Sequence, residues 1–112
     1  MYINDKILKG GEMFYRCTNL KTIPQIRMGS LTSSVRMFYS CNALSDLGGF
    51  LGLKCNLDLS HCPLTHDSII NVINGLFNVS ANPKTLTLGA SNLTKISDKE
   101  IQQATNKGWI LN

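Results

Sequence analysis

Two short stretches in the second half of the chain alternate leucine with polar residues. LDLSHCPLT at residues 57–65 recurs as LTLGASNLT at 86–94, with leucine at the first and third positions of each. Successive side chains of a β-strand point to opposite faces, so each leucine pair lies on one face of a short strand. A small residue, Cys62 or Ser91, then stands where the chain must curve and bond backbone groups internally. The pattern predicts two equivalent strand-and-turn units.

The first half of the chain contains a second internal repeat. MFYRCTNL at residues 13–20 recurs as MFYSCNAL at 37–44, which is a shorter spacing than that between the two leucine stretches. The match extends to an apolar residue three positions further on, Ile23 and Leu47. Self-similarity at such spacings indicates stacked supersecondary units, each of which buries its apolar face against its neighbours.

A helical pattern follows each leucine stretch. Apolar residues recur at i, i+3, i+4 and i+7 over residues 69–77, with Asp67 as the expected N-cap. The Ser-x-x-Glu pattern at 97–100 is a capping box, which opens a second helix, and Gly108 ends it. We therefore expect one helix after each of the two strands.

The remaining elements are shorter. Residues 12–15 and 33–39 predict helices of one to two turns, with phenylalanine and methionine in the core and the tyrosine hydroxyls at its edge. The glycine-rich segment 48–52 is too short for a helix and predicts a tight crossing loop. Short parallel strands are expected near Ile23, Leu47, Leu57, Leu86 and Ile110.

Together these elements predict an α/β repeat solenoid, a leucine-rich repeat whose short parallel strands stack into a sheet with helices on one side. Residues 1–11 are expected to be an N-terminal lead-in and residues 12–112 a single domain. The expected repeat units span about 12–35, 36–56, 57–85 and 86–112.

At these residues the chain resembles the BspA-like leucine-rich repeats of bacterial surface proteins and some phage proteins. The resemblance rests on M-F-Y-x-C-x-x-L-x-x-[I/L] at 13–23 and 37–47 and on the leucine stretch at 57–65. The end of the chain, 98–112, is similar to the closing repeat that caps such arrays. The resemblance implies adhesion, host-surface binding or virion attachment, and it brings no catalytic residues. Four or five units are few for this family, which favours a terminal fragment or a compact accessory domain.

The formal net charge of +4 lies entirely in the N-terminal half, where seven basic residues face three acidic ones up to Lys54. An excess of this kind favours an anionic partner. However, Arg16, Lys21, Arg27 and Arg36 are spread singly, without a run or an aromatic-basic alternation. A solvated surface is the better interpretation, and nucleic acid is disfavoured as a partner.

The N-terminus has no apolar core of a secretory signal peptide, and no stretch approaches the ~20 apolar residues of a membrane span. We therefore expect no export signal and no membrane span in this chain. The family resemblance implies a bacterial cell surface, secreted or virion location for a longer protein that contains it.

One cluster, Cys55, His61, Cys62 and His66, suggests a zinc site or a cysteine nucleophile. Zinc needs four converging ligands, but Cys62 belongs to an inward turn and the adjacent His61 should point outward. A buried Cys62 would also be inert as a nucleophile. The sequence therefore predicts no metal site, no cofactor and no catalytic residue, and favours a protein that is not an enzyme.

Cys17 and Cys41 occupy equivalent positions in successive units. Their Cα atoms should lie one repeat rise apart, about 5 Å, which is within the range of a disulfide. A stacked pair of buried thiols is the preferred interpretation, because free cysteine is an ordinary small core residue.

The leading functional hypothesis is a non-enzymatic module for protein or surface recognition. Its partner is expected to contact outward strand residues, namely Asp58, Ser60, Thr87 and Gly89, with Gln25 and Asp46 as looser choices. One alternative is self-association through an uncapped sheet edge near Tyr2, Ile3 and Asn4. A weaker alternative is binding of an anionic polymer by the basic N-terminal half.

Overall fold

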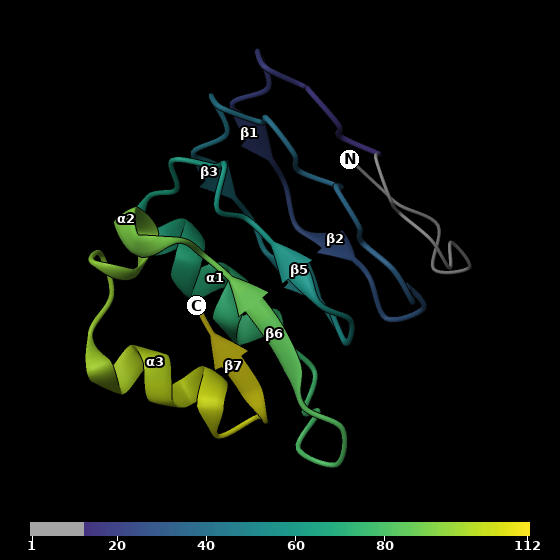
Figure 1. The fold of residues 1–112 in the computed structure, drawn as a ribbon, viewed down its shortest axis with the longest axis vertical. Helices are drawn as coiled ribbons and strands as arrows, with labels where there is room; N and C mark the ends of the chain where they lie inside the picture. The colour runs from purple at the N-terminus through teal and green to yellow at the C-terminus, as the bar shows by residue number, and fades with distance from the viewer. Residues whose placement is uncertain (1–12) are drawn as a thin grey trace.

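The computed structural model describes residues 13–112, which contain three small parallel sheets and three helices (Figure 1). β1 pairs with β3, β2 with β4, and β5, β6 and β7 form a three-stranded sheet in that order. The elements are β1 (Thr22–Ile23), β2 (Ile26–Arg27), β3 (Asp46–Leu47), β4 (Phe50–Leu51), β5 (Leu57–Asp58), α1 (His66–Gly75), β6 (Lys84–Thr87), α2 (Ala90–Leu93), α3 (Asp98–Thr105) and β7 (Trp109–Leu111).

Strand pairing follows the spacings of the sequence repeats. Ile23 pairs with Leu47, and Ile26 pairs with Phe50 at the same offset, which is that of the first repeat. Leu57 pairs with Leu86, the residue that opens the second leucine stretch. Equivalent apolar residues of neighbouring units therefore lie side by side, which keeps Ile23, Leu47, Leu57 and Leu86 on the buried faces of their strands.

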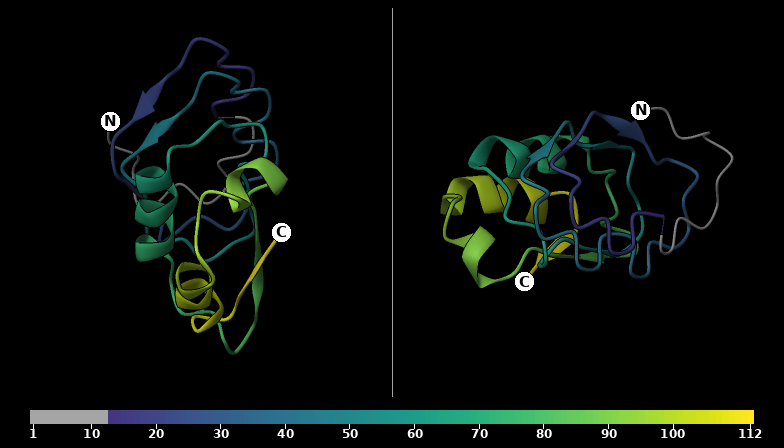
Figure 2. Two further views of the ribbon diagram at one scale, coloured as in Figure 1. Left: turned by 90° about the vertical axis from the view of Figure 1, so that its left-hand side faces the viewer. Right: turned by 90° about the horizontal axis from the view of Figure 1, so that it is seen from above.

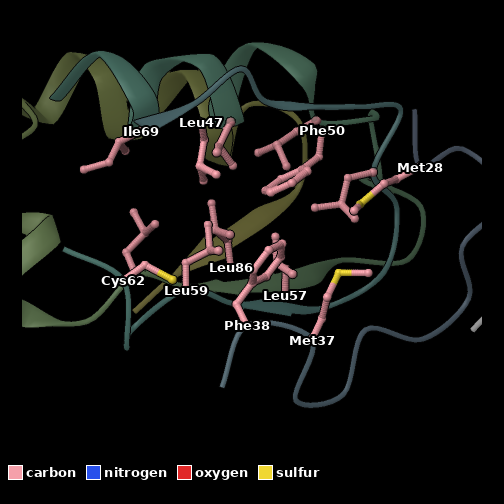
Figure 3. Close-up of a cluster of buried hydrophobic side chains, with 14 of the residues drawn as sticks. Met28, Met37, Phe38, Leu47, Phe50, Leu57, Leu59, Cys62, Ile69 and Leu86 are labelled. Carbon is pink, nitrogen blue, oxygen red and sulfur yellow. The ribbon is translucent and has the colours of Figure 1, made fainter. Parts of the chain in front are cut away.

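The strands form two layers with the core between them (Figure 2). Side chains of β3, β4 and α1, such as Leu47 and Ile69, point toward Leu59 and Leu86 of the opposite layer (Figure 3). The expectation of one continuous sheet is therefore wrong. β1 and β3 belong to the layer of α1, whereas β5, β6 and β7 form the other layer.

The segment 48–52 is the reason for this division. The sequence predicts a bare crossing loop there, but the segment contains strand β4, whose Phe50 is fully buried. The Phe50 ring lies 5.4 Å from that of Phe38, which in turn stacks on Phe14 at 5.4 Å. Burying this third ring extends the chain along the α1 layer before it crosses to β5.

Helix α1 takes the place in the stack that a strand occupies in the units before it. Its N-cap is Thr65, whose side chain accepts from the backbone N–H of Ser68, and not Asp67, which lies in the first turn. The side chain of Asn71 donates to the Leu47 carbonyl at 2.9 Å. A Cβ on Gly75 would approach the Phe50 carbonyl oxygen to 2.8 Å, so only glycine permits this contact.

Helix α3 begins as the sequence predicts. Ser97 is the N-cap, and the complete capping box with Glu100 is present. Ala104 is fully buried, and Gly108 follows the helix with a φ of 87°. A Cβ at Gly108 would lie 2.5 Å from the backbone of Ser80, so glycine is needed here both for its backbone angle and for space.

The described part of the two aromatic segments forms turns rather than the expected short helices. Arg16, Arg36 and Ser40 have φ angles of 56°, 59° and 60°, which are left-handed and interrupt a right-handed helix. Each turn still buries its phenylalanine. The expected burial of the methionines holds for Met37 but is wrong for Met13, which is exposed, and the expected helices are wrong as well.

The internal polar residue after β6 is Asn92, not Ser91, which is exposed. The Asn92 amide donates to the carbonyls of Cys62 and Leu88 at 2.8 Å each, and its oxygen accepts from the backbone N–H of Leu64. The Asn92 side chain thereby supplies hydrogen-bond partners for buried backbone groups in the turn of the preceding unit.

We expect Leu59→Ala to lower the free energy of unfolding by about 2–5 kcal/mol, because Leu59 is fully buried between the two layers. Leu51→Ala is the matched control, since Leu51 is 46% exposed and should cost less than about 1 kcal/mol. Urea denaturation followed by circular dichroism measures both. A Leu59→Ala cost no larger than that of the control would contradict the two-layer core.

Candidate functional site

The outward strand residues of β5 and β6 line a surface hollow. Asp58 and Thr87 both contribute to a cavity of about 340 Å³, together with Thr85 of β6 and Asn56, which precedes β5. Ser60 lines a neighbouring hollow of about 210 Å³. Gly89 lies against Ser60, since a Cβ there would be 3.1 Å from the Ser60 Cβ. These four predicted residues therefore share one face of the molecule.

The other two predicted residues lie elsewhere. Asp46 is exposed on β3, and Gln25 is exposed between β1 and β2. The strands around them, β1 to β4, pair only among themselves, and β3 and β4 pack against α1 rather than joining the sheet of β5 and β6. The sequence pattern groups them with Asp58 only if all strands belong to a single sheet, and that grouping is wrong.

Sequence reasoning missed the wall of this site, which is the turn at residues 32–39. Val35 is 67% exposed and lines the 340 Å³ hollow with Arg36. A second hollow of about 280 Å³ lies between Val35, Arg36, Tyr39, Asp58 and His61. The left-handed backbone at Arg36 shapes this turn, and no apolar period in the sequence signals such an angle.

An aromatic stack borders the same wall. The rings of Tyr15 and Tyr39 stack with centroids 5.4 Å apart, and the His61 ring tilts against Tyr39 at 4.7 Å. Arg16 covers Tyr15, with its guanidinium carbon 5.2 Å from the ring centroid. The expectation of tyrosines at the core edge is therefore correct, and their stack reaches the candidate site through His61.

The carboxylate of Asp58 is held in a fixed orientation. Its Oδ1 accepts from the backbone N–H and the hydroxyl of Ser60, at 2.9 and 2.6 Å. No ion pair within residues 13–112 neutralises Asp58 or Arg36, although both line the 280 Å³ hollow. The site thus presents one pre-oriented carboxylate and one guanidinium to a ligand.

At the outer edge of β5, side chains already bond several backbone groups. The Leu59 N–H donates to Thr87, so the peptide groups of Leu57 and Leu59 face β6 and those of Asp58 point away from it. On that outer side the Ser34 hydroxyl donates to the Asn56 carbonyl, and the Ser60 N–H donates to Asp58. Within β5 itself, only the peptide groups of Asp58 point outward to a ligand at this edge.

The Cys55, His61, Cys62 and His66 cluster does not assemble into a metal site. Across residues 13–112, no group of three or more histidine, cysteine or acidic side chains is placed to hold a metal ion. The His61 ring tilts against Tyr39 at the surface, while Cys62 lies in the core. The adjacent residues face opposite ways, as the repeat pattern indicates.

The buried cysteines are poor nucleophiles. Burial raises the pKa of Cys62 to about 12, and nearby Cys41 and Asp58 contribute to this rise. Burial also raises the pKa values of Cys41 and Cys55. All four cysteines are free thiols, and the Cys41 thiol donates to the Phe14 carbonyl at 3.0 Å.

His66 connects the first turns of α1 and α3. Its Nδ1 lies 3.1 Å from Asp67 Oδ1 and its Nε2 lies 2.8 Å from Glu100 Oε2. The hydrogen bond to Asp67, followed by that to Glu100, raises the pKa of His66 above 6.5. The pKa of Glu100 is lowered, first by the Ser97 backbone N–H and then by His66.

The two alternative surfaces are less defined. Tyr2, Ile3 and Asn4, the proposed self-association edge, lie outside the described residues. Two cations of the basic half lie over separate aromatic rings, Arg16 over Tyr15 and Lys54 over Phe77. Neither alternative gains a defined site from these contacts.

Comparison of the chain with protein-family models, with curated proteins and with solved structures returned no match. The helices within residues 13–112 all lack the length and apolar character needed to cross a membrane.

We expect Cys62 to resist alkylation in the native protein. At pH 8 a thiol with a pKa of about 12 is ionised in roughly one molecule in ten thousand, and burial blocks access as well. Timed iodoacetamide labelling with peptide mass mapping should show modification of half-buried Cys17 first and of Cys62 only after unfolding. Equal labelling rates for the two residues would contradict this packing.

We expect the His66–Glu100 interaction to stabilise the fold most between about pH 4.5 and 6.5. The contribution of His66 is present below its unfolded pKa of 6.5 and is lost as pH rises through the raised folded value. That of Glu100 is present above 4.5 and is lost as pH falls through its lowered value.

Glu100→Gln tests this arrangement, because glutamine keeps the capping box while removing the charge. The pKa of His66, measured by NMR titration of its ring protons, should fall in the variant. An unchanged pKa would show that Asp67 alone is responsible for the shift.

Proposed function

We propose that this protein is a non-catalytic recognition module of the leucine-rich-repeat type, which binds its ligand on the outward face of β5 and β6 beside residues 32–39. The observation that carries the proposal is the row of hollows on this face, of about 340, 280 and 210 Å³. Three of the residues expected to face a partner, Asp58, Thr87 and Ser60, line these hollows, and Gly89 lies beside Ser60. Concave sites with a few fixed polar groups are the usual form of a binding site.

The chemistry of the face supports binding rather than catalysis. Its thiol neighbours are buried with raised pKa values, and Asp58 is held by Ser60 with no histidine or lysine of the described chain bonded to it. A nucleophile needs an adjacent, oriented base. The two regular repeat offsets support the repeat assignment, and the resemblance to surface and phage proteins supports a role in attachment.

The test compares variants of the two layers. Asp58→Ala and Thr87→Ala alter the proposed face, whereas Gln25→Ala and Asp46→Ala alter exposed residues of the α1 layer. The wild-type protein is screened on glycan and peptide arrays, and each variant is measured with every ligand found. We expect Asp58→Ala to weaken binding about tenfold or more, and the two α1-layer variants to leave it unchanged.

Circular dichroism of each variant separates loss of binding from loss of fold. A ligand lost with Asp46→Ala and retained with Asp58→Ala would move the interface to the α1 layer and overturn the proposal. Sedimentation at two protein concentrations tests the self-association alternative. A mass that doubles with concentration, together with no array ligand, would favour an assembly role instead.

A further inference from the structure

The three hollows on the β5–β6 face are adjacent, and together we call them the groove. The first and second share Val35, Arg36 and Asp58, and the second and third share His61. Asp58 therefore lies where the first two hollows of the groove adjoin, beside the turn at 32–36. A ligand that occupies this groove meets Asp58 from either direction.

Most residues that line the groove are neutral and polar, although Ser34 and Asn92 are buried and bonded internally. Hydroxyls and amides come from both walls and from the floor, while the charged residues are one guanidinium, Arg36, and one carboxylate, Asp58. The neutral polar residues are Thr32, Ser33, Ser34, Asn42, Asn56, Ser60, Thr85, Thr87, Ser91 and Asn92. Because the two charges balance, the groove has no net attraction for a polyanion or a polycation.

The groove is poorly suited to an added peptide strand. Such a peptide needs a run of free backbone groups and apolar pockets for alternate side chains. The edge of β5 offers the peptide groups of a single residue, Asp58, because Ser34 and the Asp58 side chain occupy the positions on either side. Of the two large aliphatic residues that line the first two hollows, Leu57 is buried and Val35 alone is exposed.

A sugar ring fits these features better. Its hydroxyls both donate and accept, which matches a fixed carboxylate oxygen, a planar guanidinium and surrounding hydroxyls. Its C–H surfaces need apolar contact beside those polar groups. The part of the Tyr39 side chain that Tyr15 and His61 leave exposed, 41%, and the exposed Val35 supply that contact at the second hollow.

We propose that the groove centred on Asp58 is a binding site for a neutral oligosaccharide. Asp58 accepts hydrogen bonds from sugar hydroxyls through its Oδ2, since Oδ1 is occupied by Ser60. Arg36 donates from the opposite wall, and Tyr39 with Val35 contacts the ring. The inference rests on the proposed recognition function and names the class of ligand for its face.

The experiment is an NMR titration of the ¹⁵N-labelled full chain. The probes are neutral hexasaccharides of glucose, mannose, galactose, xylose and N-acetylglucosamine, with dextran sulfate and polylysine as charged comparisons. At least one neutral probe should shift the amide signals of residues 32–36 and 58–61. The charged polymers should leave these signals unchanged at physiological salt.

Variants separate hydrogen bonding from charge. Asp58→Ala should weaken binding of the neutral probe about tenfold or more. Asp58→Asn keeps the acceptor oxygen for Ser60 and places an amide donor where Oδ2 meets the sugar, and because sugar hydroxyls also accept, it should weaken binding no more than about threefold. Tyr39→Ala should also reduce binding. Asp46→Ala, on the other layer, is the control and should have no effect.

The proposal is overturned if no neutral hexasaccharide shifts these signals, or if Asp58→Asn is as damaging as Asp58→Ala. Shifts confined to α1 would overturn it as well. If a peptide from the arrays binds and Asp58→Ala abolishes that binding, the recognition function stands and the saccharide assignment falls. The two proposals can therefore fail separately.

Discussion

The architecture depends on one requirement, that backbone groups at the ends of very short strands find partners inside the molecule. Such strands form few hydrogen bonds with neighbouring strands. Side chains from a neighbouring unit therefore bond the backbone groups that remain. Ser68 and Asn71 do this around Leu47, and Asn92 does it for the turn that follows Leu59. In the described part of the chain, every buried side-chain nitrogen and oxygen also has a partner. The stacking of units therefore buries apolar side chains and also gives the buried polar groups their hydrogen-bond partners.

The sequence predicts strand pairing because the same spacing must place equivalent apolar residues side by side. Leu57 and Leu86 pair as the spacing of the leucine stretches requires. The division into two layers was not predictable in this way, since it depends on burial of Phe50 within a segment whose composition predicts a glycine loop. Asn92 was missed for a related reason. Helix α2 begins at Ala90, so the second turn is wound differently and its internal position shifts by one residue.

The floor of the candidate site follows from strand alternation, which places Asp58 and Thr87 outward once their leucine neighbours point inward. Its wall does not follow, because it depends on the left-handed backbone at Arg36 and on a ring contact between Tyr39 and His61. Such contacts join residues from different units. A periodic pattern describes each unit in isolation. It therefore identifies which strand residues face outward, but not which residues of another unit lie across the groove from them.

Most side-chain bonds between units run in one direction along the chain. Asn71 donates to Leu47, Asn92 to Cys62 and Trp109 to Phe77. In each case the side chain of a later residue donates to a backbone carbonyl earlier in the chain. A ribosome releases the earlier backbone first. Each new unit of a growing chain therefore meets acceptors that are already in place, and assembly can proceed in the order of synthesis without waiting for the C-terminus.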